Sequence, residues 1–285
     1  MTEGALVLEG GSLRCLFTSG VIDTLIEQEI ELSYVNGVSA GSMCGMNYVS
    51  KQVGRTRQIN TEYVRDKRYL SFRNMMKNRL IFNFDFLFGE LSQNLVPFDY
   101  ETFEKSKQRF VAVATRCKTG RPEYFEKGRC SDIISAVQAS SSMPVLSRMI
   151  VVDGKKYLDG GVSMPIAYQK AIDEGYEKVV VVLTREHGYR KAPVGPWMQK
   201  AYDRYFGPLP EFLAALNDIP ERYNRMQEEI DQLEAAGRIF VIRPEKPVLV
   251  SRVEKDVRKL EALYQEGRAT AEKALPALKK YLDLI

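Results

Sequence analysis

The stretch YVNGVSAGSM, residues 34–43, sets Ser39 between two glycines directly after a short strand-like run. Gly37 and Gly41 have no Cβ, so backbone can approach closely on both sides of the serine. A strand that turns sharply into a helix needs that room, and the turn leaves its central residue on a strained, exposed corner. The pattern G-x-S-x-G therefore predicts a nucleophile elbow with Ser39 as the nucleophile, although a chance match of common residues is the alternative.

Strand patterns alternate with helix patterns on both sides of this motif. Buried strands are indicated at residues 5–8, 34–38, 110–115 and 178–184, and helices at residues 13–29, 40–53 and 131–141. The unbroken β-branched run at 178–184 is typical of a parallel strand that is covered on both faces. The sequence therefore predicts an α/β fold, a three-layer α/β/α sandwich with a mainly parallel central sheet.

In the last third of the chain the regular alternation of strand and helix patterns ends. We expect a loop rich in glycine and proline over residues 185–210 and one long helix over residues 211–236. A strand over residues 238–243 and a charged helix within residues 251–285 follow. These segments predict a helical C-terminal extension to the sandwich.

Length, composition and charge exclude several classes of protein. The chain has 285 residues, of which 45% are hydrophobic and 27% charged, as in a globular protein with a sizeable core. A net charge of +4 is too small to indicate nucleic acid as a partner. The four cysteines form no C-x-x-C pair, which argues against a metal site. Because no export signal is evident, we expect a cytoplasmic protein.

The positive charge is concentrated in one segment. Residues 51–80 hold nine basic side chains against two acidic ones, and a phenylalanine series accompanies them: Phe72, Phe82, Phe84, Phe86 and Phe88. One interpretation is a lid and acyl pocket with peripheral contact to an anionic membrane surface. The other is a solvated helix followed by phenylalanines of the core.

A serine nucleophile needs donors for the oxyanion that it generates. Gly10, Gly11 and Ser12 lie between the first strand and the first helix, so their amides are at a helix N-terminus, where negative charge is stabilised. A dinucleotide loop is the alternative, but GGSLRC at residues 10–15 lacks the full G-x-G-x-x-G pattern. We therefore interpret this loop as an oxyanion hole.

The nucleophile also needs a base, and the residues leave two candidates. His187 is the single histidine of the chain, and the order Ser39, Asp159, His187 is that of α/β-hydrolases. Asp159 follows a short strand and precedes Gly160 and Gly161, which permit a close approach of backbone. An ordinary Asp-Gly turn is the alternative interpretation of that segment.

Together these motifs resemble the patatin-like phospholipase family. EGGSLR (residues 9–14) is similar to its oxyanion loop, with Arg14 at the basic position, and GVSAG (37–41) to its elbow. ASSSMPVL (139–146) and DGG (159–161) are similar to its aspartate region. The chain departs from the family pattern at Ser12 and Cys15, where glycine is usual, and at Glu9, where aspartate is commoner.

The resemblance implies hydrolysis of lipid acyl esters, of the phospholipase, lysophospholipase or esterase type, through a Ser39–Asp159 dyad and an acyl-enzyme. Asp159 would act as general base and then acid, and no metal or cofactor would be needed. A patatin-like catalytic domain is expected over residues 5–175, and a strand-and-helix extension on the same core over residues 176–285. The alternatives are a triad that uses His187, and a catalytically weak protein of this fold that binds lipid or a partner.

Overall fold

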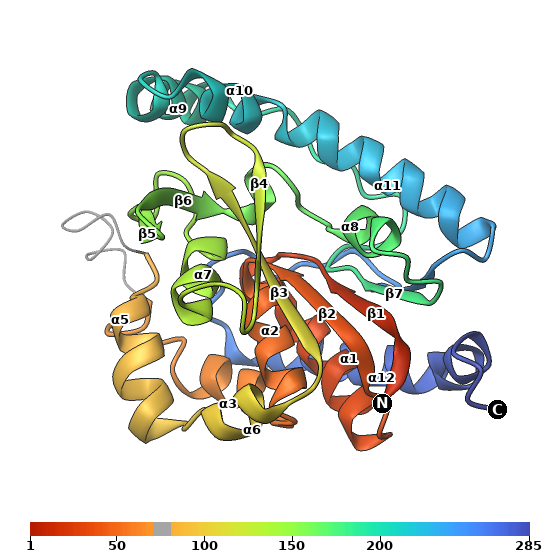
Figure 1. Cartoon of the computed structure of the whole chain (residues 1–285). Coiled ribbons are helices and arrows are strands. Elements are labelled where there is room, and N and C mark those ends of the chain that lie inside the picture. Colours follow the sequence, from red (N-terminus) through yellow and green to blue (C-terminus); the bar gives the residue numbers. More distant parts are fainter. Residues whose placement is uncertain (71–80) are drawn as a thin grey trace.

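The computed structural model describes residues 1–70 and 81–285 and is built around one mixed sheet (Figure 1). In the described residues this sheet has eight strands, in the order β5-β6-β3-β2-β1-β7-β8, with β4 also paired to β3. The strands are β1 (Thr2–Leu8), β2 (Leu32–Val38), β3 (Arg109–Arg116), β4 (Pro122–Glu126), β5 (Ile150–Val152), β6 (Lys155–Asp159), β7 (Val179–Val182) and β8 (Phe240–Ile242). β3, β2, β1, β7 and β8 run parallel, whereas β4 and β6 pair antiparallel to β3.

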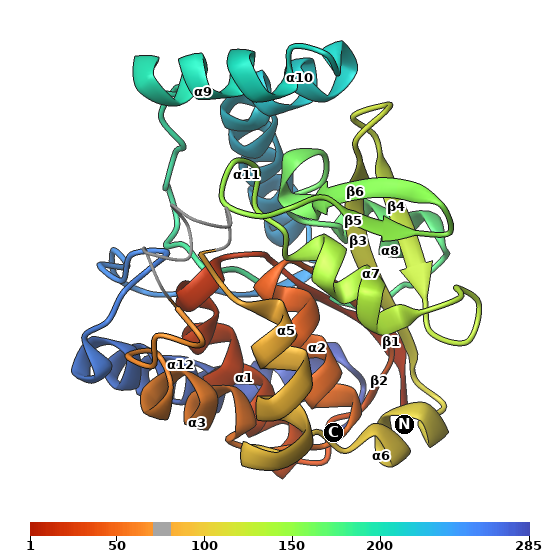
Figure 2. The same cartoon turned by 90° about the vertical axis from the view of Figure 1, so that its left-hand side faces the viewer.

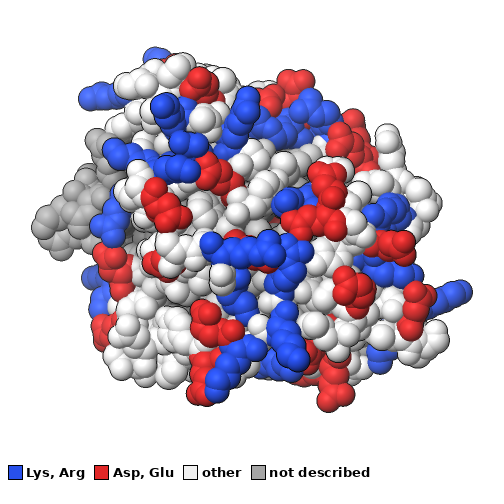
Figure 3. All heavy atoms as spheres, viewed as in Figure 1, with Lys and Arg blue, Asp and Glu red and all other residues white. Residues whose placement is uncertain are grey.

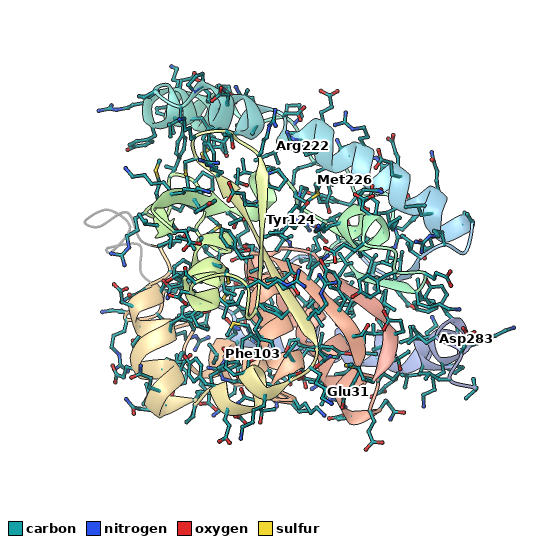
Figure 4. All side chains as sticks on the ribbon, viewed as in Figure 1. Glu31, Phe103, Tyr124, Arg222, Met226 and Asp283 are labelled. Carbon is teal, nitrogen blue, oxygen red and sulfur yellow. The ribbon has the colours of Figure 1, made fainter. Side chains whose placement is uncertain are left out.

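Helices cover both faces of the sheet, because alternate side chains of each strand enter opposite cores. Leu6 and Leu8 of β1 pack on the side of α1 (Cys15–Glu27), α2 (Ala40–Val49) and α12 (Val257–Tyr281). Ala5 and Val7 pack on the side of α8 (Tyr168–Asp173) and α11 (Ile219–Ala235), where Tyr124 and Met226 also lie (Figure 4). The predicted three-layer α/β/α sandwich with a mainly parallel sheet is confirmed.

Shorter helices complete the layer on the α2 side. They are η1 (Ser12–Arg14), α3 (Arg55–Glu62), α5 (Phe84–Phe86), the π-helix η2 (Leu87–Leu95), α6 (Tyr100–Lys105) and α7 (Ile133–Ser140). The short helix η3 (Gly160–Val162) follows β6, and its Val162 packs with Phe206 and Phe212 instead. Phe103 of α6, which Figure 4 labels, packs edge-on against Phe110 of β3, with ring centroids 5.4 Å apart. These contacts fix the start of β3, whose far end carries part of the site.

Two predictions for the last third of the chain are wrong. The loop expected over residues 185–210 contains the helix α9 (Pro196–Phe206), because a proline in the first turn is compatible with a helix start. The single helix expected over residues 211–236 is two helices, α10 (Pro210–Asn217) and α11. Pro220 lacks the amide that would continue the first helix, so the chain turns at Asp218. Figure 2 shows α9 and α10 at one end of the molecule.

The C-terminal segments contribute to the same sheet and the same core. β7 pairs with β1 and β8 with β7, and α12 lies along α1 (Figure 1). The two helices approach closely, since a Cβ on Gly267 would lie 2.1 Å from the carbonyl oxygen of Phe17. Glycine at this position therefore permits the contact between the first and last helices.

Neighbouring acidic side chains neutralise part of the positive charge of the basic segment, residues 51–80. Lys51 pairs with Glu31 at 2.5 Å, Arg57 with Glu261 at 2.7 Å, and Arg68 with Asp66 at 2.8 Å and with Glu90 at 3.0 Å. Acidic and basic side chains are also interspersed over the face shown in Figure 3. Phe72, Arg73, Lys77 and Arg79 lie outside the described residues. Within the described part of the chain, no helix is long and apolar enough to cross a bilayer.

Candidate active site

Ser39 lies at the sharp turn between β2 and α2. Its backbone has φ 55° and ψ −130°, a conformation that is strained for a residue with a Cβ. Its amide donates a hydrogen bond to Oγ of Ser140 at 2.8 Å, and Oγ of Ser140 donates to the carbonyl oxygen of Val113 at 2.6 Å. The turn is thus held from β3 and α7, which keeps Ser39 at the carboxyl edge of the parallel strands.

The two glycines of the elbow permit backbone-to-backbone contact. A Cβ on Gly37 would lie 2.5 Å from Cα of Ser42, and a Cβ on Gly41 would lie 2.5 Å from the carbonyl oxygen of Leu8. Contacts this short with backbone cannot be relieved by rotating a side chain. The structure therefore explains both glycines of the G-x-S-x-G pattern.

Asp159 lies at the end of β6, opposite Ala114 of β3, and is 7% exposed. Its Oδ2 accepts a hydrogen bond of 2.7 Å from Oγ of Ser39, and its Oδ1 accepts one of 2.7 Å from the amide of Gly161. Burial raises the pKa of Asp159, and the hydrogen bonds from Ser39 and Gly161 oppose that effect. The structure thus brings Ser39 and Asp159 together across 120 positions of the sequence.

The D-G-G segment is fixed closely against β3. A Cβ on Gly160 would lie 2.1 Å from the carbonyl oxygen of Val113, so a side chain cannot be accommodated there. The amide of Asp159 donates to the carbonyl oxygen of Ser142 at 2.8 Å, and its carbonyl oxygen accepts from Oγ1 of Thr115 at 2.8 Å. These contacts set the position of the carboxylate relative to the elbow.

The loop of Gly10, Gly11 and Ser12 passes next to the elbow, and a Cβ on Gly10 would lie 2.9 Å from the carbonyl oxygen of Val38. Among the described residues, the amides of these three residues donate no hydrogen bond. Ser12 has φ 51°, a left-handed conformation that favours glycine, and its Oγ donates to the carbonyl oxygen of Arg252 at 2.7 Å. The loop thus presents free amides beside Ser39, although a serine replaces the usual glycine.

Glu9 anchors this loop to the other side of the site. Its Oε2 accepts hydrogen bonds from the amide of Thr184 at 2.5 Å and from Oγ1 of Thr184 at 3.0 Å. Its Oε1 accepts from the hydroxyl of Tyr223, on α11, at 2.9 Å. Cys15 is buried beneath the loop and its Sγ donates to the carbonyl oxygen of Glu9 at 3.5 Å. Two of the departures from the family pattern therefore have well-defined partners.

Arg14 is buried at the same loop, with 8% of its surface exposed. Its Nε has no hydrogen-bond partner in the described part of the chain. Burial lowers the pKa of Arg14, and the nearby guanidinium groups of Arg185 and Arg252 lower it further. Glu9 raises the pKa of Arg14 in part, but its carboxylate is hydrogen-bonded by Thr184 and Tyr223 and not by Arg14.

His187 does not lie beside the nucleophile. Its side chain is 72% exposed, and its Nε2 is 3.5 Å from Oδ2 of Asp231 on α11. Since the chain has one histidine, the structure brings no histidine to Ser39, whose hydroxyl instead donates to Asp159.

Two cavities meet at Ser39. The first, the apolar cavity, is lined mainly by hydrophobic side chains, among them Met43, Met46, Ile59, Tyr69, Phe82, Phe84, Phe88 and Phe98. The second, the polar cavity, is lined by Gly10, Gly11, Asp159 and a set of charged side chains. Ser12, Ser39 and Met143 line both cavities, so a ligand with an apolar and a polar part could contact Ser39 between the two.

Sequence reasoning missed several residues of the polar cavity. Arg185 and Lys191 follow β7, and Arg252 precedes α12. Their position after a parallel strand was the available signal, because ligands bind at the carboxyl ends of such strands. Ser140 lies in the ASSSMPVL segment named above, but its role in holding the amide of Ser39 is not predicted from the sequence. Among the described residues, no group of three or more histidine, cysteine, aspartate or glutamate side chains could hold a metal ion.

Comparisons with known proteins give matches along the whole chain. A family model described as "Patatin-like phospholipase" matches residues 6–171, and one described as "Domain of unknown function (DUF6363)" matches residues 209–283. The chain is similar to "Uncharacterized protein YjjU" of Escherichia coli (strain K12), with 26% identity over 98% of this chain and 78% of that protein. It is also similar in structure to VipD from Legionella pneumophila, with a TM-score of 0.45 and 14% identity over 97% of this chain and 67% of that chain.

Proposed function

The chain belongs to the patatin-like phospholipase family, and we propose that it hydrolyses acyl esters of lipids with Ser39 as nucleophile and Asp159 as general base. The observation that carries the proposal is the 2.7 Å hydrogen bond from Oγ of Ser39 to Oδ2 of Asp159. An aspartate with an ordinary pKa is a weak base, but burial raises the pKa of Asp159 toward the range where a base is effective.

The proposed reaction has two halves. In the first, Oγ of Ser39 attacks the ester carbonyl while its proton passes to Asp159, and the amides of Gly10, Gly11 and Ser12 stabilise the oxyanion. Asp159 then donates that proton to the departing alcohol, which leaves an acyl-enzyme. In the second half, Asp159 takes a proton from water, the hydroxide attacks the acyl carbonyl, and Ser39 regains its proton as the fatty acid is released.

The two cavities support a lipid ester as the substrate. The aromatic and methionine side chains of the apolar cavity can cover an acyl chain, which gains roughly 0.8 kcal/mol for each methylene removed from water. The alcohol part would then occupy the polar cavity on the other side of Ser39. This arrangement gives Phe82, Phe84 and Phe88 of the phenylalanine series the role of an acyl pocket.

We propose that residues 5–175 are the catalytic domain, since Ser39, Asp159 and the glycine loop all come from them. Residues 176–285 would be an extension on the same core. Peripheral contact with an anionic membrane surface is supported by Trp197, which is 89% exposed on α9, and by Met198, which is 42% exposed at the polar cavity. A cytoplasmic location stays a prediction.

One observation favours a second candidate, a lipid-binding protein with little catalytic activity. Ser12 adopts the left-handed conformation that glycine prefers, and its side chain is tied to the carbonyl oxygen of Arg252. If this loop held its amides away from the oxyanion, lipid could bind without being hydrolysed.

A fluorophosphonate probe distinguishes the two candidates, because it labels an activated serine. The wild type should be labelled and should hydrolyse p-nitrophenyl acyl esters, whereas Ser39→Ala should do neither. Ser19→Ala is the matched control, since Ser19 is buried on α1 and its Oγ has no partner among the described residues. An unlabelled wild type that still binds lipid would favour the second candidate, and labelling of Ser39→Ala would exclude Ser39 as the nucleophile.

A further inference from the structure

Four basic side chains surround the polar cavity next to Ser39, and we name them the basic wall: Arg14, Arg185, Lys191 and Arg252. Within the described residues, the carboxylates that line the same cavity are those of Glu9 and Asp159. Four cations against two carboxylates leave a surplus of two positive charges beside the proposed nucleophile.

Both carboxylates are already engaged by other donors. Glu9 accepts hydrogen bonds from Thr184 and Tyr223, and Asp159 accepts them from Ser39 and Gly161. No residue in the described ranges forms an ion pair with any member of the basic wall. The wall therefore has no counter-charge of its own within hydrogen-bonding reach.

The basic wall also contains buried hydrogen-bond donors that have no acceptor in the described part of the chain. The Nε atoms of Arg14 and Arg185 are buried and have no partner among the described residues. Burial, together with the charges of Arg252 and Arg14, lowers the pKa of Lys191 to about 8, although Glu9 and Asp159 oppose this shift. A buried donor of a cation is costly to leave without a partner unless an anion completes it, so the Nε atoms of Arg14 and Arg185 indicate a site for an anionic ligand.

Two tyrosine rings in the cavity argue against a ligand that carries a quaternary ammonium group. The guanidinium carbon of Arg185 lies 4.4 Å from the ring centroid of Tyr189, and Nζ of Lys191 lies 4.1 Å from that of Tyr223. Aromatic faces could otherwise hold a quaternary ammonium, as in choline. Because each of these rings already carries a cation, a choline group in this cavity would meet like charge.

We propose that the basic wall binds a phosphate monoester on the alcohol part of the substrate, so that the enzyme prefers acyl esters of a phosphorylated polyol such as an acylglycerol phosphate. A phosphate monoester carries nearly two negative charges at neutral pH, which match the surplus of the wall. The inference rests on the proposed acyl hydrolysis, since it assigns the acyl chain to the apolar cavity and the phosphate to the polar cavity.

Most of the wall comes from outside the patatin-like segment, and Arg252 lies within the segment that the DUF6363 model matches. Arg185, Lys191 and Arg252 lie beyond residues 6–171, and each has a backbone or side-chain anchor. The amide of Lys191 donates to Oδ1 of Asn224 at 2.7 Å, and Nδ2 of Asn224 donates back to its carbonyl oxygen at 3.1 Å. Nη1 of Arg185 donates to the carbonyl oxygen of Val248 at 2.9 Å. The last third of the chain thus specifies the head group in this proposal.

The first test compares three substrates with the same short, soluble acyl chain: a 1-acylglycerol 3-phosphate, its phosphocholine ester and the neutral 1-acylglycerol. The phosphate monoester should have the highest kcat/KM, by about tenfold or more, since hydrogen bonds to charged groups are stronger than those between neutral groups. Lys191→Gln and Arg252→Gln should each lower the ratio of phosphate to neutral kcat/KM about tenfold. Lys200→Gln, an exposed lysine of α9, is the charge-matched control and should keep the wild-type ratio.

The second test separates binding from catalysis. In the Ser39→Ala variant, calorimetry should show tighter binding of a non-hydrolysable 1-alkylglycerol 3-phosphate than of the 1-alkylglycerol, and Lys191→Gln with Arg252→Gln should remove the difference. Equal affinities, or selectivity that survives both substitutions, would overturn the basic wall even if esters are hydrolysed. Selective binding without hydrolysis of any ester would instead contradict the proposed function and leave the wall standing.

Discussion

Gly41, in the first turn of α2, touches Leu8 at the end of β1. A Cβ on Gly41 would lie 2.5 Å from the carbonyl oxygen of Leu8 and 2.6 Å from that of Glu9. Leu8 and Glu9 lead directly into the loop whose amides are the proposed oxyanion donors. The distance between the nucleophile and those donors is therefore set by contact of backbone with backbone, which no side-chain rotation can adjust.

Gly41→Ala should lower both stability and activity. The added methyl group must displace β1 or α2, and overpacking of this kind costs about 1–3 kcal/mol, measurable by urea denaturation. Ester hydrolysis should fall further than stability alone explains, because the loop of Gly10 moves away from Ser39. Gly195→Ala is the control, since a Cβ there would meet nothing within 4 Å. Wild-type activity in Gly41→Ala would contradict this role of the contact.

Asp159→Asn should lower kcat/KM by about 10²–10⁴, because an amide cannot accept the proton of Ser39. In the wild type, burial raises the pKa of Asp159 above its ordinary 3.8, and the reactive form is the deprotonated one. The rate should therefore fall as the pH drops through that raised pKa, and the acidic limb should be missing from Asp159→Asn. His187→Ala should keep the wild-type rate and profile. If His187→Ala were the more damaged variant, the triad would replace the dyad.

The apolar cavity predicts a dependence on acyl chain length. Each added methylene should raise kcat/KM about fourfold until the cavity is full, which corresponds to about 0.8 kcal/mol of burial. Phe84→Ala should flatten this series, because Phe84 lines the cavity and packs edge-on against Phe88 with centroids 6.0 Å apart. Phe212→Leu, a buried change at the Phe206 contact, is the control and should leave the slope unchanged, since neither ring lines the cavity. If kcat/KM of the wild type did not depend on acyl chain length, the cavity would not be an acyl pocket.

Much of the fold follows from local signals in the sequence. The alternation of strand and helix patterns predicts the sandwich, and the β-branched run at 178–184 predicts β7, whose residues are all fully buried. The region after Thr184 is harder to predict, because Pro196 and Pro220 both lie in the first turn of a helix, which composition alone does not indicate. Pro196 begins a helix after Gly195, whereas Pro220 follows the point where α10 ends.

In the candidate site, too, some residues are predictable from local sequence signals and others are not. Ser39, Asp159 and the glycine loop stand in short motifs whose spacing carries the chemistry, so sequence reasoning could name them. The basic wall has no such motif, because its members are far apart in the sequence. Arg252, for example, accepts a hydrogen bond from Ser12, which lies 240 positions earlier in the chain. The charge of the wall becomes significant only when folding brings four cations around one cavity and engages both nearby carboxylates elsewhere.

Asp23 of α1 predicts how stability varies with pH. Its Oδ2 accepts hydrogen bonds of 3.0 Å from the amide of Gly54 and from the hydroxyl of Tyr264, and burial raises its pKa to about 6 from the ordinary 3.8. Because the folded-state pKa is raised, this group contributes stability that is fully present below about pH 4 and is lost as the pH rises through about 6. Relative to the wild type, Asp23→Asn should therefore gain about 1–3 kcal/mol between about pH 4 and pH 7.

Urea denaturation of both proteins across that pH range measures the difference. The asparagine keeps an acceptor oxygen for Gly54 and Tyr264 but carries no charge to desolvate. A stability difference that does not change with pH would show that Asp23 titrates as an exposed carboxyl group does.

Lys191 should confine the phosphate preference to a window of pH. Burial lowers the pKa of Lys191 to about 8, and a phosphate monoester loses its second proton with a pKa of about 6. The charged lysine and the dianion therefore coexist between these two values, so the ratio of kcat/KM for the acylglycerol phosphate to that for the neutral acylglycerol should peak near pH 7. Taking this ratio removes the titration of Asp159, which affects both substrates.

Lys191→Arg, whose guanidinium stays charged, should keep the acidic limb and extend the preference to higher pH. A ratio that is flat in the wild type from about pH 6 to pH 9, or an alkaline limb that survives in Lys191→Arg, would contradict the part of Lys191 in the basic wall.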